Sequence, residues 1–186
     1  MDVRPPEPLK LFICYSHKNE GLRDDIVTCL QPLKRRGLIS AWWDGKISPG
    51  TEWARDIVEK LDAADIILLL ISRHFLASDF IQEVELKRAM ERHSDGKACL
   101  IPVILSDCDW QIESFGKLQV LPKDGVPITS TSWGHIEQAF ADFARGIRKA
   151  VEELREKSAL TSGTSRKING TASTDSEATK KSATKA

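Results

Sequence analysis

Short apolar runs alternate with amphipathic stretches along the chain from Leu9 onward, a pattern typical of alternating strands and helices. The apolar runs predict strands at 11–15, 39–43, 65–72, 98–105 and 126–129. The stretches with apolar residues at helical spacing predict helices over 20–36, 52–63, 78–95 and 136–154. The run 65–72 is almost continuously apolar, as expected for a central strand that is buried on both faces.

This alternation predicts one α/β domain with a flavodoxin-like, doubly wound five-stranded parallel sheet, order 2-1-3-4-5, and helices on both faces. Pro102 lacks a backbone N–H, which indicates that the fourth strand lies near the sheet edge. In this order the winding reverses between strands one and three, so a crevice is expected at their carboxyl ends. The residues expected on one side of the crevice are Tyr15, Ser16 and His17, and those expected on the opposite side are Ser72, Arg73 and His74. The loop 44–51 is expected to form one wall of this crevice.

Charge is balanced overall but unevenly distributed. The 27 basic and 27 acidic residues give a net charge of zero, which disfavours bulk binding to nucleic acid or to an anionic membrane. Residues 157–186 contain six basic and two acidic residues, a net charge of +4, which leaves 21 basic and 25 acidic residues, or −4, in residues 1–156. The 157–186 segment is rich in Ser and Thr and has no aromatic residue. We therefore predict an N-terminal arm (1–8), a domain (9–156) and a disordered tail (157–186).

Several classes of protein are disfavoured by what the sequence contains. The longest strongly apolar run, 66–71, is far below the roughly 20 residues that span a bilayer, and MDVRPPEPLK has no signal-peptide pattern. We therefore expect a cytoplasmic protein without a membrane partner. The four cysteines show no metal-ligand or Cys-x-x-Cys spacing, so free structural thiols and no metal are expected: Cys14, Cys29, Cys99 and Cys108. The chain has no Gly-x-Gly-x-x-Gly, which disfavours a Rossmann hydride-transfer enzyme.

Three stretches together carry a family resemblance. They are FICYSHKNE at 12–20, WWDGKISPG at 42–50 and SRHFLASDFIQEVEL at 72–86. In this order, and on these predicted elements, they resemble the first strand, the BB loop and the start of the αC helix of the Toll/interleukin-1 receptor (TIR) domain, bacterial type. The resemblance covers about residues 9–154.

The resemblance implies two possible functions. Many family members are NAD⁺ glycohydrolases that release nicotinamide, and some cyclise the ADP-ribose product into a signal; others are scaffolds that pair with further TIR domains. We expect the first function, in immune or anti-phage signalling and dependent on self-association, with NAD⁺ as substrate and no cofactor. One carboxylate suffices for this reaction, because nicotinamide leaves a cationic pyridinium as a neutral molecule and needs no acid.

Two glutamates compete for the catalytic position that the family has near the start of this helix. Glu83 and Glu85 lie about 200° apart around an α-helix, so only one can face the crevice. Lys87, four residues after Glu83, favours an exposed ion pair there. Glu85 is therefore the expected catalytic residue and Glu83 the alternative. Catalytic relatives often have an aromatic residue four positions before the glutamate, whereas Phe80 lies five positions before Glu85.

The remaining site residues are expected to bind the dinucleotide. Serine hydroxyls at the strand ends can bind its polar groups, and a tryptophan after the second strand can flank one of its rings. Phe80 is expected to stack on nicotinamide, although a core aromatic that anchors the helix is the alternative. The expected substrate-binding residues are Tyr15, Ser16, Trp43, Asp44, Ser72 and Phe80.

Overall fold

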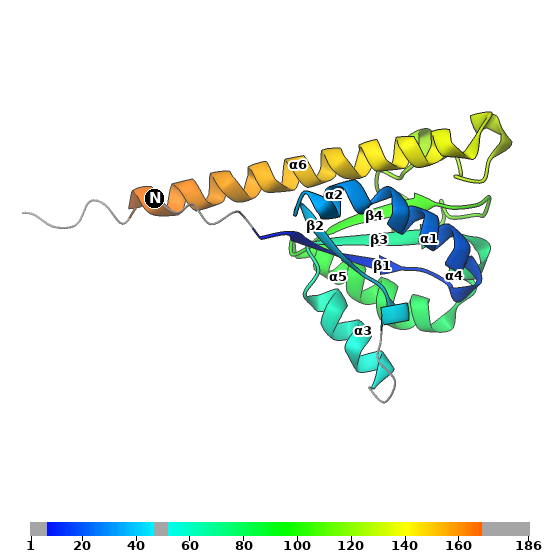
Figure 1. Ribbon diagram of the computed structural model, residues 1–186. Coiled ribbons are helices and arrows are strands. Elements are labelled where there is room, and N and C mark those ends of the chain that lie inside the picture. Colours follow the sequence, from blue (N-terminus) through cyan, green and yellow to red (C-terminus); the bar gives the residue numbers. More distant parts are fainter. Residues whose placement is uncertain (1–6, 47–51, 169–186) are drawn as a thin grey trace, which may run out of the picture. The chain divides into compact units, whose positions relative to one another are not determined.

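Four parallel strands form the central sheet. The computed structural model describes residues 7–46 and 52–168. The strands are β1 (Leu9–Cys14), β2 (Ile39–Trp42), β3 (Ile66–Ile71) and β4 (Cys99–Ile104), in the order β2-β1-β3-β4 (Figure 1). β1 pairs with both β2 and β3. The predicted parallel sheet, wound outward in both directions from β1, is confirmed.

The hydrophobic pattern of the strands matches their places in the sheet. Every residue of β3 is buried, because neighbouring strands flank it and helices cover both of its faces. β4 is the outermost strand, as Pro102 predicted. The Pro102 carbonyl accepts a hydrogen bond from the backbone N–H of Leu121 at 2.9 Å, while the missing proline N–H leaves no donor unpaired.

The fifth strand expected at 126–129 is not present, so the described sheet has four strands. The N–H of Ile128 donates to the carbonyl of Ile104 at 2.9 Å, and Leu121 makes a single parallel bridge to β4. Residues 126–129 thus lie beside the end of β4 without forming a strand that pairs with it. Pro127 precedes Ile128 and has no N–H to donate, which interrupts strand pairing at this point.

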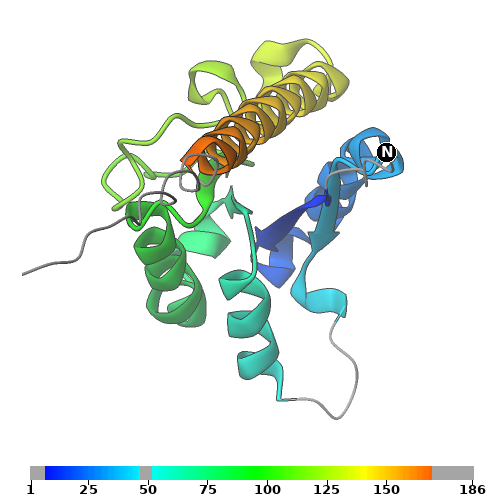
Figure 2. The same cartoon turned by 90° about the vertical axis from the view of Figure 1, so that its left-hand side faces the viewer.

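Helices cover both faces of the sheet, as predicted for a doubly wound fold (Figures 1 and 2). One face carries α1, α2 and the part of α6 up to Val151, and the other carries α3 and α5. Their bounds are α1 (Glu20–Cys29), α2 (Gln31–Arg35), α3 (Trp53–Asp62), α5 (Lys87–Ser94) and α6 (Ile136–Ile168). The α3 and α5 side holds a core that includes Phe12, Ile57, Phe75 and Leu86.

Two predicted helices are each divided in the structure. The helix predicted over 20–36 breaks at Leu30, and α2 begins with Pro32 in its first turn, where a missing N–H costs nothing. The helix predicted over 78–95 consists of a π-helix, η3 (Ile81–Leu86), followed by α5. A short helix, α4 (Arg73–Leu76), precedes them. Gly96 ends α5 with a φ of 68°, a conformation that glycine adopts without strain.

The last helix extends beyond its predicted end. α6 continues to Ile168, so residues 157–168 of the predicted disordered tail are helical, and residues 169–186 lie outside the described part. The chain divides into two compact units, residues 1–151 and 152–186, and the sheet belongs to the first. Within the described residues, no helix is long and apolar enough to cross a membrane.

Candidate functional site

The carboxyl ends of three neighbouring strands bring short polar segments to one edge of the sheet. β1 ends at Cys14 and leads into a 3₁₀ turn, η1 (His17–Asn19). β2 ends at Trp42 and leads into a second turn, η2 (Asp44–Lys46). Because the strands are parallel, both turns lie at the edge where β3 also ends, at the reversal point of the winding.

Glu85 lies beneath this edge on the π-helix η3. Its side chain is nearly buried, with 6% of the residue exposed, whereas Glu83 on the same helix is exposed. Its Oε2 accepts a hydrogen bond from the thiol of Cys14, with a sulfur–oxygen distance of 2.9 Å. The two candidate glutamates therefore face different surroundings, and it is Glu85 that reaches the ends of the strands. π-Helical turns are rare and occur frequently at functional sites.

Burial sets the protonation of the Glu85 carboxyl. The pKa of Glu85 is raised from 4.5 to about 7, and removal from water is the largest cause. The thiol hydrogen bond from Cys14 lowers the pKa, the negative charge of Asp44 raises it and His17 lowers it. The carboxyl can thus exchange its proton near neutral pH. Such a shifted pKa at the ends of strands is a feature of functional sites.

The thiol beside Glu85 keeps its proton. Burial, followed by the negative charge of Glu85, raises the pKa of Cys14 well above its ordinary value. Cys14 is therefore the donor in this pair and Glu85 the acceptor.

An ion pair joins the two turns. Nε2 of His17 lies 2.9 Å from Oδ2 of Asp44, and Nδ1 of the same ring lies 3.3 Å from Oε1 of Glu20. The Asp44 side chain is 10% exposed, whereas the His17 side chain is largely in solvent. Asp44 thus has a cationic partner when His17 is protonated, which limits the repulsion between Asp44 and Glu85.

A buried arginine supports the aromatic residues of this edge. The Arg23 guanidinium lies 4.7 Å from the ring centre of Tyr15 and 5.3 Å from that of Trp43, both within cation–π range. The Tyr15 hydroxyl is buried, and its pKa is raised, first by burial and then by the nearby Asp44 carboxylate. Arg23 therefore fixes Tyr15 and Trp43 beside Asp44.

The two serines differ in their surroundings. Ser16 caps η1, where its hydroxyl accepts a hydrogen bond from the Lys18 N–H at 3.4 Å. Ser72 is fully buried. Its hydroxyl donates to Oδ1 of Asn19 at 2.7 Å and accepts from the N–H of Phe75 at 3.1 Å. The Ser72 hydroxyl therefore ties η1 to the start of α4 and is already engaged by protein groups.

Phe80 packs against a tryptophan at the start of α3. Its ring centre lies 4.4 Å from that of Trp53, which is 42% exposed. A π-helix closes hydrogen bonds between residues five apart, so Phe80, at the N-cap of η3, stands one turn before Glu85. Whether Phe80 stacks on nicotinamide or anchors the helix as a core aromatic stays a prediction, and its ring is already packed against Trp53.

Comparison with known proteins identifies the family. A sequence model of the TIR domain matches residues 11–153. The chain belongs to the TIR domain family. The resemblance in the three sequence stretches is thereby confirmed.

Two further comparisons agree with a TIR domain. The chain is 46% identical over 141 residues to the uncharacterized protein y4lF of Sinorhizobium fredii; the match covers 76% of this chain and 43% of that protein, so the chain spans less than half the length of this relative. The crystal structure of the TIR domain of the Toll-related receptor TRR-2 from Hydra magnipapillata superposes with a TM-score of 0.54 at 16% identity, covering 76% of this chain and 97% of that one. At this identity the second match supports the fold alone.

In this TIR domain the structure brings together most of the residues expected at the site. Tyr15, Trp43, Asp44 and Glu85 lie around the ends of β1 and β2, while Phe80 lies one turn away. The expected wall at 44–51 is described only through Lys46, and residues 47–51 lie outside the described part.

Sequence reasoning missed three contributors to this cluster. The sequence predicts only a structural thiol at Cys14, and it indicates neither the contact between His17 and Asp44 nor the place of Arg23 beside Tyr15 and Trp43. The alternation of the first strand signals which way Cys14 faces, but nothing in the sequence indicates that its partner is Glu85.

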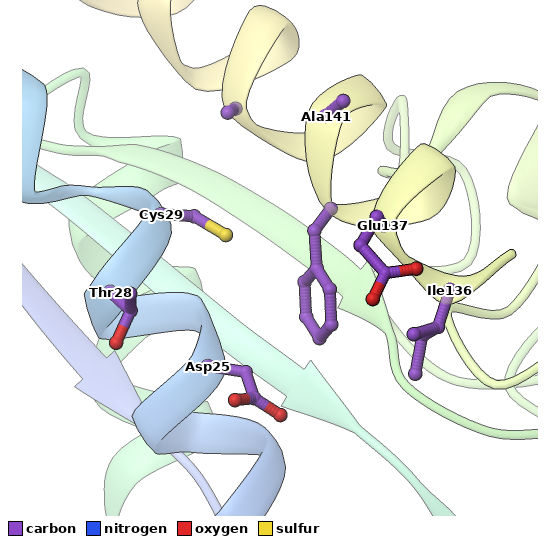
Figure 3. A pocket seen from close by; sticks show the side chains of 8 residues that line it. Asp25, Thr28, Cys29, Ile136, Glu137 and Ala141 are labelled. Carbon is purple, nitrogen blue, oxygen red and sulfur yellow. The ribbon is translucent and has the colours of Figure 1, made fainter.

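A separate hollow lies on the opposite face of the TIR domain. It has a volume of about 470 Å³, and none of the residues around Glu85 line it. Figure 3 shows α1 on one side and the first part of α6 on the other. Its labelled residues are Asp25, Thr28, Cys29, Ile136, Glu137 and Ala141. This hollow is not part of the site described above.

Proposed function

We propose that this TIR domain is an NAD⁺ glycohydrolase that cleaves the bond between nicotinamide and ribose, with Glu85 as its catalytic residue. The observation that carries the proposal is a nearly buried carboxyl, with a pKa of about 7, at the strand ends of a TIR domain. The TIR family includes NAD⁺ hydrolases. An exposed surface glutamate such as Glu83 has no comparable environment.

The charge of the substrate suits this carboxyl. A cationic nicotinamide ring placed beside Glu85 favours loss of the carboxyl proton, because an opposite charge lowers the pKa of an acid. The resulting carboxylate stabilises the positive charge that develops on ribose as the glycosidic bond breaks. Nicotinamide leaves as a neutral molecule, so no second carboxyl is needed as an acid.

The neighbouring residues provide binding groups for the rest of the nucleotide. Asp44 has acceptor oxygens for ribose hydroxyls, and Ser16 has a hydroxyl group on a partly exposed side chain at the N-cap of η1. Trp43 and Phe80 offer aromatic rings on which the rings of the dinucleotide can stack. Tyr15 packs against Arg23 beside Asp44. Ser72 contributes by holding η1 in place.

Self-association and a signalling role in the cytoplasm complete the proposal. TIR domains typically interact with other TIR domains, and the proposed enzyme acts after such assembly, in immune or anti-phage signalling. The second candidate is a non-catalytic TIR–TIR interaction module. The partly exposed Trp53 at the start of α3 favours it, because an exposed aromatic side chain is a common anchor in protein interfaces.

The decisive test is NAD⁺ turnover by the purified full chain. The protein is incubated with NAD⁺ over a range of protein concentrations, and nicotinamide, ADP-ribose and cyclic products are separated by liquid chromatography. We expect nicotinamide release with a specific activity that rises with protein concentration, because assembly precedes cleavage. Absence of release at every concentration, together with concentration-dependent self-association, would favour the interaction module.

A further inference from the structure

The thiol of Cys14 is placed where it acts directly on Glu85. Cys14 ends β1 and is 1% exposed, so water does not compete for its hydrogen bond. Its sulfur lies 2.9 Å from Oε2 of Glu85, which comes from η3, and the two residues are 71 positions apart in the chain. This contact therefore joins the central strand of the site to the π-helix that carries the carboxyl.

The direction of the hydrogen bond is fixed by charge. A carboxylate can only accept, and the thiol retains its proton because burial and the adjacent Glu85 both oppose its ionisation. Within the described residues, Cys14 is the hydrogen-bond donor to Glu85. A donor to an ionised acid stabilises the charged form over the neutral one.

We propose that Cys14 is a positioning residue for Glu85: its S–H donates to Oε2, orients the carboxylate at the strand ends and stabilises its ionised form. The consequence for NAD⁺ cleavage rests on the proposed function. The effect of the thiol on the ionisation of Glu85 does not, so the two can fail separately.

The other groups that influence Glu85 act in opposite directions. Asp44 on η2 disfavours the carboxylate and His17 on η1 favours it. The core beside η3 is apolar, with Ile57 and Leu61 from α3 and Phe75 from α4. Burial is the largest influence on Glu85, and the thiol is the next. Cys14 is thus the strongest single group that favours the carboxylate.

The test measures the ionisation of Glu85 directly. The full chain is labelled with carbon-13 at the glutamate carboxyl, and the Glu85 signal is identified by its loss in Glu85→Gln. Titration midpoints are compared for the wild type, Cys14→Ala and Cys14→Ser. Cys108→Ala is the control, because Cys108 is a partly buried thiol in a different segment.

The expected results follow from the donor strength of each side chain. Cys14→Ala removes the donor and is expected to move the midpoint upward by about half to one pH unit. Cys14→Ser retains a donor and is expected to keep the midpoint at or below the wild-type value. Cys108→Ala is expected to leave it unchanged.

Two results would overturn the proposal: a wild-type midpoint in Cys14→Ala, or an upward shift in Cys14→Ser as large as that in Cys14→Ala. If Cys14→Ala does not fold, the serine variant alone decides, since an upward shift there contradicts the proposal. Where NAD⁺ is cleaved, the acid limb of the rate profile is expected to follow the same order. If NAD⁺ is not cleaved, the proposed function fails, while the titration still decides the role of Cys14.

Discussion

Nε2 of His17 lies 2.9 Å from Oδ2 of Asp44, so the turn after β1 and the turn after β2 are joined by an ion pair at the edge of the sheet. Both residues act on Glu85, with Asp44 opposing its ionisation and His17 favouring it. The contact therefore places two opposing influences on Glu85 side by side. It also fixes the start of η2, from which the segment outside the described residues continues.

Substitution of His17 is expected to make Glu85 harder to ionise. His17→Gln retains a hydrogen-bond donor for Asp44 but removes the imidazole that favours the Glu85 carboxylate. The Glu85 titration midpoint is then expected to rise by roughly a few tenths of a pH unit, as measured by carboxyl carbon-13 NMR. His135→Gln, at an exposed histidine far along the chain, is the control and is expected to have no effect. A lower midpoint in His17→Gln would show that the assigned electrostatic role is wrong.

The free energy of unfolding is expected to depend on pH because of Glu85. Its pKa rises from 4.5 to about 7 on folding, so the neutral acid stabilises the folded state fully below about pH 4.5, and this contribution is lost as the pH rises through 7. The free energy of unfolding of the wild type, relative to Glu85→Gln, is expected to fall by about 3 kcal/mol between about pH 4 and pH 8. Urea unfolding of both proteins across this range measures the difference.

Glu83→Gln is the matched control for this experiment, because Glu83 is exposed on the same helix. The difference in the free energy of unfolding between Glu83→Gln and the wild type is expected not to change with pH. If the difference in the free energy of unfolding between Glu85→Gln and the wild type does not change with pH, Glu85 ionises in the folded state as easily as in the unfolded chain.

Ser72→Ala is expected to destabilise the domain. The change removes the hydroxyl that donates to Asn19 and accepts from the Phe75 N–H, and it leaves the buried Phe75 N–H and the partly buried Asn19 side chain without this partner. We expect a loss of about 1–2 kcal/mol in the free energy of unfolding, seen as a lower Tm. Ser16→Ala, at the partly exposed N-cap of η1, is the comparison and is expected to cost less. An unchanged Tm in Ser72→Ala, combined with lost NAD⁺ cleavage, would instead assign Ser72 a direct substrate contact.

The sheet was predictable because its signals are local. The continuous apolar run of β3 predicted a strand buried on both faces, and Pro102 predicted an outer position for β4. The expected fifth strand failed because hydrophobicity at 126–129 predicts burial, whereas pairing also needs N–H groups that Pro127 does not supply. The extension of α6 to Ile168 is not predictable from composition, because a polar segment rich in Ser and Thr is compatible with either disorder or a helix.

The site was predictable in position but not in its contacts. Parallel winding alone brought Tyr15 and Asp44 to one edge. The choice of Glu85 over Glu83 assumed α-helical spacing, whereas the segment is a π-helix, which hydrophobic periodicity does not distinguish. The hydrogen bond between Cys14 and Glu85 depends on the packing of distant elements, and no local signal in the sequence encodes it.

The most direct test of the central claim is the rate of nicotinamide release by Glu85→Gln compared with Glu83→Gln. Both variants are measured as folded full-length chains, at one protein concentration and at a pH above 7. We expect Glu85→Gln to lose at least about 100-fold in rate, because the carboxylate that stabilises the developing positive charge is gone, while Glu83→Gln stays within about two-fold of the wild type. A wild-type rate in Glu85→Gln would show that Glu85 is not the catalytic residue.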